Sequence, residues 1–116
     1  MTFGPSYFDA FATLPNASFV IDIPMKKNNL KNSELFAKDA YEKIGAARVV
    51  ALEIGNEPNN YGKSIADYVK QWANWSARIL KTLGLNENEK IYQAVCLGSE
   101  TGVTKFPGGT PKDWKV

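Results

Sequence analysis

Apolar positions along the chain follow two periods, one typical of amphipathic helices and one typical of buried strands. Helical spacing predicts helices over residues 6–14, 33–45 and 64–84. Short, nearly continuous apolar runs predict strands over residues 18–23, 48–54 and 90–97. Because helices and strands alternate, the pattern predicts parallel β-α units and an α/β fold class.

The ends of these helices carry recognisable signals. Ser6 and Ser33 are the expected N-caps of the first two helices, and Gly45 ends the second. The helix over 64–84 should bury one stripe and end at Gly84. That stripe contains Ile65, Tyr68, Val69, Trp72, Trp75, Ile79 and Leu83.

The predicted strands are apolar nearly throughout, which is typical of a parallel sheet covered on both faces. Residues 99–116 have neither period and are rich in Gly, Pro, Thr and Lys, so we expect an irregular or disordered tail after an ordered part spanning residues 1–98. Three strands leave both sheet edges open, and the first helix has no strand before it. The sequence therefore favours a piece of a larger domain.

Composition limits the classes of partner. The chain has 116 residues, of which 44% are hydrophobic and 22% charged, as in ordinary globular proteins. Its net charge is only +2 and its longest basic run is Lys26-Lys27, so we expect no nucleic-acid partner. No apolar segment approaches the roughly 20 residues that span a bilayer, so we expect no membrane partner.

The chemistry available to the chain is also limited. It has no histidine, which excludes Ser-His-Asp and Cys-His nucleophiles and most zinc sites. The single cysteine, Cys96, lies in an apolar run and is expected to be a core residue. No nucleotide-binding glycine pattern occurs. We therefore expect no cofactor and no metal, and any catalysis must depend on carboxylates.

The stretch "VVALEIGNEPNNY", residues 49–61, is the candidate site. An apolar strand ends there at Gly55 and is followed directly by Asn56 and Glu57. In parallel α/β folds, functional groups gather at the C-terminal ends of strands. Pro58 should hold Glu57 in an extended conformation. A carboxylic acid beside an amide suits glycoside chemistry, in which an acid protonates the leaving oxygen.

The chain resembles glycoside hydrolase family 79, the β-glucuronidase and heparanase family of clan A, and especially its fungal members. The resemblance spans roughly residues 2–100. It is carried by "FGPSYFDAFATLP", "SFVIDIP" followed by "KKNN", "ALEIGNEPNNY" and "YVKQWANW". It implies a partial (β/α)8 TIM barrel, in which 18–23, 48–54 and 90–97 correspond to the third, fourth and fifth strands.

The resemblance also implies roles for individual residues. Glu57 would be the general acid/base, and Asn56 would contact the 2-hydroxyl of the sugar. Tyr61, Asn28 and Asn29 are candidate cleft-lining, substrate-binding residues. The implied partner is a glucuronide-containing glycan or glycoside, cleaved at a β-glucuronide-type O-glycosidic bond.

One departure from the family pattern is large. Family members are retaining enzymes whose nucleophile is a second Glu at the end of the seventh strand, and a full barrel takes about 250 residues. This chain stops soon after the fifth strand. We therefore expect a fragment that contains the acid/base but not the nucleophile and is inactive alone.

Other interpretations stay open. A Glu before a Pro in a strand-to-helix loop is usually a solvated turn residue, and Glu53 and Glu100 are further carboxylates, expected in a structural role and in the tail. Trp72 and Trp75 have the helical spacing of core residues rather than of a sugar-stacking platform. The alternative function is a small non-catalytic α/β module that binds carbohydrate or a protein partner.

Two N-glycosylation sequons occur, at Asn16 ("NAS") and Asn74 ("NWS"). At ~100° per residue, Asn74 lies nearly opposite the apolar stripe of its helix. The N-terminus shows no signal peptide. The family resemblance nevertheless implies a secreted parent protein, glycosylated at Asn74.

Overall fold

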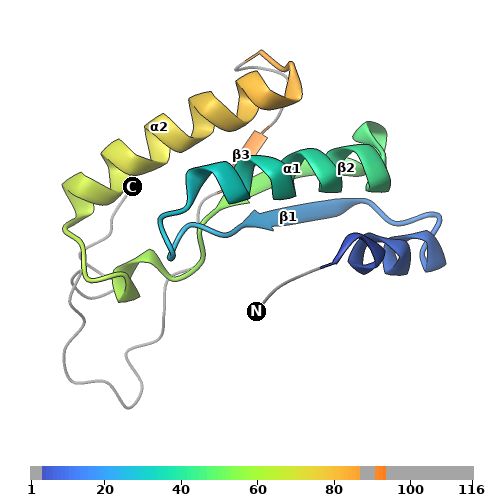
Figure 1. The fold of residues 1–116 in the computed structure, drawn as a ribbon, viewed down its shortest axis with the longest axis horizontal. Helices are drawn as coiled ribbons and strands as arrows, with labels where there is room; N and C mark the ends of the chain where they lie inside the picture. The colour runs from blue at the N-terminus through green and yellow to red at the C-terminus, as the bar shows by residue number, and fades with distance from the viewer. Residues whose placement is uncertain (1–3, 87–90, 94–116) are drawn as a thin grey trace.

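The structure is a computed structural model, and it describes residues 4–86 and 91–93. Three parallel strands form one sheet in the order β1-β2-β3, with bounds Phe19–Ile23, Val49–Ile54 and Ile91–Gln93. Two α-helices connect them, α1 (Leu30–Ile44) and α2 (Ile65–Leu83). Three 3-10 segments complete the described part: η1 (Pro5–Thr13), η2 (Ala46–Arg48) and η3 (Pro58–Asn60). The predicted mixed α/β class is confirmed, and Figure 1 shows the arrangement of these elements.

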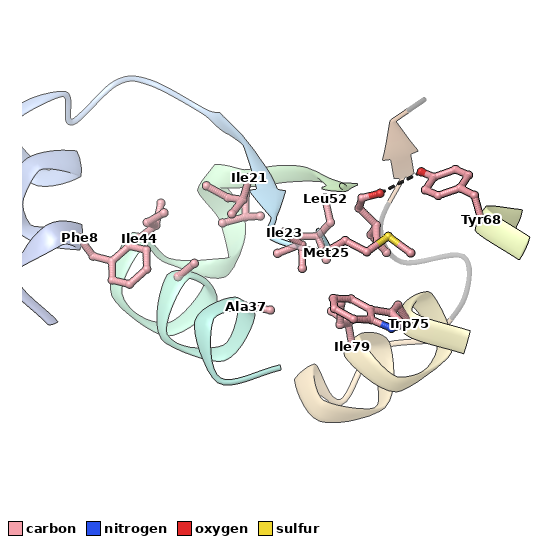
Figure 2. Close-up of a cluster of buried hydrophobic side chains, with 13 residues drawn as sticks. Phe8, Ile21, Ile23, Met25, Ala37, Ile44, Leu52, Tyr68, Trp75 and Ile79 are labelled. Carbon is pink, nitrogen blue, oxygen red and sulfur yellow. Dashed lines mark hydrogen bonds between the residues drawn. The ribbon is translucent and has the colours of Figure 1, made fainter. Parts of the chain in front are cut away.

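The core lies between the sheet and the two α-helices. Ile21 pairs in register with Leu52, and Ile23 with Ile54, so these four side chains share one sheet face. All four belong to the same buried cluster as Ala37, Ala40, Trp75 and Ile79 of the helices (Figure 2). Both α-helices therefore pack on the same face.

The opposite sheet face is only partly covered. Val20 is 44% exposed and Asp22 is also exposed, whereas Ala51 is buried and Glu53 is half-buried. The prediction that both faces of every strand are covered is wrong for β1. Its side chains alternate between buried and exposed positions, with Ile21 and Ile23 buried.

Two predicted helix starts are also wrong. The first segment is a 3-10 helix whose N-cap is Gly4, so Ser6 lies inside it. Helix α1 begins at Leu30, where the side chain of Asn29 accepts a hydrogen bond from the Asn32 N–H at 3.1 Å. Ser33 is a buried residue within α1, and its hydroxyl donates to the carbonyls of Pro24 and Asn29. The serine therefore ties α1 to the end of β1 instead of capping the helix.

The long helix matches its prediction within one residue at each end, with Ser64 as N-cap and Gly84 as C-cap. Trp75 is buried and Trp72 packs partly buried against the core, as predicted. Val69 is 55% exposed, however, so its place in the buried stripe was wrong. The buried residues of the helix are Tyr68 in its first half and Trp75, Ser76, Ile79 and Leu80 in its second half.

Some predictions fall on positions outside the described residues. These are the predicted strand beyond Gln93, the burial of Cys96, the place of Glu100 and the tail over 99–116.

Candidate functional site

The candidate site lies at the C-terminal end of β2, in the loop that leads into α2. Gly55 ends the strand pairing by donating its N–H to the carbonyl of Ile23 at 3.0 Å. Its φ of +85° is a conformation that residues with a Cβ rarely adopt. The chain leaves the sheet at this glycine, and the side chains of Asn56 and Glu57 are both exposed to solvent.

Glu57 has a left-handed backbone, with φ 49° and ψ 54°. The prediction of an extended Glu57 is therefore wrong, although the following proline still keeps it out of the right-handed helical region. The conformation is held by a turn in which the N–H of Asn60 donates to the carbonyl of Glu57 at 2.9 Å. Pro58 is almost fully buried beneath the loop, so the exposed carboxylate stands on an anchored turn.

The Glu57 carboxylate has one hydrogen-bond partner within its own turn. Nδ2 of Asn60 donates to Oε2 of Glu57 at 3.2 Å. Asn60 is not among the site residues predicted from the sequence. Its position three residues after the carboxylate, at the end of a short 3-10 turn, is the signal that could have identified it.

Two tyrosines hold the backbone on either side of Gly55. The hydroxyl of Tyr61 accepts a hydrogen bond from the Asn56 N–H at 2.9 Å. The hydroxyl of Tyr68 donates to the carbonyl of Ile54 at 3.1 Å, which is the dashed line in Figure 2. Burial is the main cause that raises the pKa of each tyrosine above its ordinary value. Both phenols therefore stay protonated at neutral pH.

Three carboxylates lie close enough to Tyr61 to affect it. The charges of Asp22, Glu57 and Glu53 each raise its pKa, whereas the hydrogen bond from Asn56 lowers it. Partial desolvation, and secondarily the charge of Glu53, raises the pKa of the Asp22 carboxyl group above its ordinary value of 3.8. The site therefore has an acidic character.

Asn28 and Asn29 follow β1, at the sheet edge that also carries the candidate site. Oδ1 of Asn28 accepts from Nε2 of Gln71 at 2.7 Å, and Gln71 also accepts from Lys63. The side chain of Asn29 caps α1. Within the described residues, neither asparagine is hydrogen-bonded to Asn56 or Glu57. The structure thus brings Asn56, Glu57 and Tyr61 together, and gives Asn28 and Asn29 structural bonds of their own.

Two further properties of the described residues concern metal ions and membranes. They contain no group of three or more His, Cys, Asp or Glu side chains arranged to hold a metal ion. Among the same residues, no helix combines the length and apolar character needed to cross a membrane. Both sequon asparagines, Asn16 and Asn74, are exposed.

Comparison with known proteins relates the chain to an enzyme that acts on carbohydrates. No model of a known protein family matches the chain. A β-glucuronidase of Aspergillus niger is 30% identical to it over an alignment 97 positions long, which covers 72% of this chain. The similarity suggests a relationship to glycoside hydrolases. The match spans only 18% of the length of that relative, so it does not carry the relative's whole activity over to this chain.

Proposed function

We propose that this chain supplies the acid/base segment of a retaining glycoside hydrolase that acts on β-glucuronides. The observation that supports the proposal is the position of the Glu57 side chain. Its exposed carboxylate follows a buried parallel strand, on a turn anchored by Pro58 and Asn60, beside the exposed amide of Asn56. The partial similarity to a β-glucuronidase supports the choice of substrate.

In the first step of this chemistry, a nucleophilic carboxylate attacks the anomeric carbon. Glu57, as the protonated acid, transfers its proton to the glycosidic oxygen while the bond between that oxygen and the anomeric carbon breaks. The alcohol leaves, and the sugar is held as an ester of the nucleophile. Asn56 would donate a hydrogen bond to the neighbouring 2-hydroxyl during this step.

In the second step, Glu57 is a carboxylate and acts as a base. It takes a proton from water while the water oxygen attacks the anomeric carbon and the bond to the nucleophile breaks. The free sugar leaves, and Glu57 regains its acid form. Retention requires the two carboxyl groups to lie about 5–5.5 Å apart. The position that the family resemblance gives to the nucleophile, the end of a seventh strand, has no counterpart in β1, β2 or β3.

The proposal extends to the fold and the compartment. Sequential parallel strands with both α-helices on one face have the arrangement of consecutive βα units in a (β/α)8 barrel. In such a barrel the face with Val20, Asp22, Ala51 and Glu53 would point inward. The family resemblance further supports a secreted parent protein.

A chimeric enzyme tests the proposal. The matching segment of the A. niger β-glucuronidase is replaced by this chain, and hydrolysis of alkyl and aryl β-glucuronides is measured after circular dichroism and gel filtration confirm folding. Glu57→Gln should lower the rate on the alkyl glucuronide about 100-fold or more, because an unactivated leaving group needs the acid. Glu53 is a neighbouring carboxylate, so Glu53→Gln is the matched control. It should leave the ratio of the rates on the alkyl and aryl glucuronides unchanged.

The same proposal can be tested on the 116-residue chain itself. Titration with a non-hydrolysable thio-β-glucuronide, followed by NMR, should shift the side-chain amide signals of Asn56. If the folded, active chimera with Glu57→Gln hydrolysed the glucuronides as fast as its parent, a catalytic role for Glu57 would be contradicted. If the thioglycoside still shifted the Asn56 signals, the chain would instead be a non-catalytic carbohydrate-binding module.

A further inference from the structure

The phenol of Tyr61 closes the loop that carries Asn56 and Glu57. Its hydroxyl oxygen accepts the Asn56 N–H at 2.9 Å, five residues back along the chain. The N–H of Tyr61 donates to the carbonyl of Pro58 at 3.0 Å, so the same residue is bonded to the turn on both sides of Glu57. These two hydrogen bonds therefore close the loop on itself.

The phenol lies directly against Gly55. A Cβ on Gly55 would come within 3.0 Å of the Tyr61 hydroxyl oxygen and 3.2 Å of the Met25 sulfur. Only a residue without a side chain lets the phenol approach the backbone this closely. Met25 is buried in the main core (Figure 2). Tyr61 packs partly buried against the same cluster, so the core helps to hold its ring in addition to the bonds within the loop.

We propose that Tyr61 is a positioning residue, which fixes the Asn56 peptide and thereby the direction of Glu57, instead of a residue that binds sugar. This inference rests on the proposed function only for its consequence in catalysis. The contact itself is a property of the loop. Preorganisation of this kind matters because a small misplacement of a reacting group costs a large part of the rate.

The protonation state of the phenol is compatible with this role. Burial raises the pKa of Tyr61 above its ordinary value of 10.0. The oxygen that receives the Asn56 N–H is therefore that of a neutral phenol throughout the neutral range, and the contact does not switch with pH there.

Amide hydrogen exchange in the 116-residue chain, without any carbohydrate, tests the contact. In the parent chain, the Asn56 amide should exchange more slowly than the Glu57 amide. Tyr61→Phe keeps the ring and removes the acceptor, so the Asn56 amide should exchange about 3–10-fold faster. The matched control is Tyr68→Phe, which removes the hydroxyl bonded to Ile54 and should leave the Asn56 amide within twofold of the parent.

Two results would overturn the inference. One is an unprotected Asn56 amide in the parent chain, a measurement that does not depend on any variant folding. The other concerns the chimera, where Tyr61→Phe should lower kcat about tenfold and leave KM within twofold, as expected for lost positioning. An unchanged kcat would refute the positioning role. Because the exchange experiment needs no activity, it can fail or succeed independently of whether Glu57 catalyses.

Discussion

Asp22 on β1 and Glu53 on β2 are register partners, so two carboxylates stand beside each other on the sheet face opposite the α-helices. Asp22 is an exposed residue, but partial desolvation of its carboxyl group, with the charge of Glu53 as the smaller cause, raises its pKa above 3.8. The folded chain therefore binds the Asp22 proton more tightly than the unfolded chain does. Stability is lost as pH rises from about 3.8 through the raised pKa.

The raised pKa of Asp22 beside Glu53 leads to a prediction on how the stability of the fold depends on pH. Asp22→Asn should raise the free energy of unfolding at pH 7, because the variant has no charge to desolvate beside Glu53. The gain should disappear at pH 3, where Asp22 is protonated in both states. Urea unfolding at the two pH values measures this difference. If Asp22→Asn changed the free energy of unfolding equally at pH 3 and pH 7, the raised pKa of Asp22 would not be the cause of the change.

A second prediction concerns Arg48, which joins η1 to the sheet. Its guanidinium donates to the carbonyls of Ala17 at 3.0 Å and Phe11 at 2.9 Å, and also to that of Leu14. It lies 5.1 Å from the centre of the Phe19 ring. Arg48→Ala should lower the free energy of unfolding by about 2 kcal/mol, because three carbonyls lose a charged donor.

Lysine has a single ammonium in place of the planar guanidinium, so Arg48→Lys should recover only part of this loss. Lys38→Ala is the control, since its ion pair with Glu42 is exposed at both ends and should contribute less than about 0.5 kcal/mol. Equal losses in Arg48→Ala and Lys38→Ala would mean that Arg48 does not hold η1.

A third prediction compares two glycines, to distinguish the cost of a strained backbone from the cost of a steric clash. Gly55 and Gly84 both have positive φ, but a Cβ would meet Tyr61 and Met25 at Gly55 and no atom within 4 Å at Gly84. Gly84→Ala should cost about 1 kcal/mol from its backbone conformation. Gly55→Ala should cost about 2–4 kcal/mol, because steric displacement adds to the strain. Similar losses in the two variants would contradict the packing of the phenol against Gly55.

A fourth prediction concerns glycosylation. Asn74 is exposed on α2, but Ser76, the third residue of its sequon, is buried and donates its hydroxyl to the Trp72 carbonyl. A glycan at Asn74 must therefore be added before α2 packs. We predict that the chain, secreted from yeast behind a signal peptide, carries N-glycan at Asn74 and that Asn74→Gln removes it. Peptide mass spectrometry that finds Asn74 unmodified would be evidence against this.

The order and type of the elements could be predicted because each has a clear period and a clear end signal. Gly84 and Ser64, for example, limit α2 within one residue. The start of α1 was misplaced because Asn29 and Ser33 are both good caps, and only the packing of Ser33 against Pro24 decides between them.

The site was predictable in position but not in conformation. The strand and Gly55 placed Asn56 and Glu57 at the sheet edge, as the structure shows. The left-handed backbone of Glu57 depends on hydrogen bonds from Asn60, and the position of the Asn56 peptide depends on the Tyr61 hydroxyl. Such contacts across several residues leave no periodic signal in a sequence.

Azide rescue in the folded chimera tests directly whether Glu57 is the acid/base. In Glu57→Gln with an activated aryl β-glucuronide, azide should attack the glycosyl-enzyme carbon, displace the carboxylate and restore turnover, because azide needs no base. We expect Glu57→Gln to give a glucuronosyl azide that retains the β configuration, and Glu53→Gln to give no such product. Undiminished hydrolysis by Glu57→Gln, with no azide product, would contradict this role.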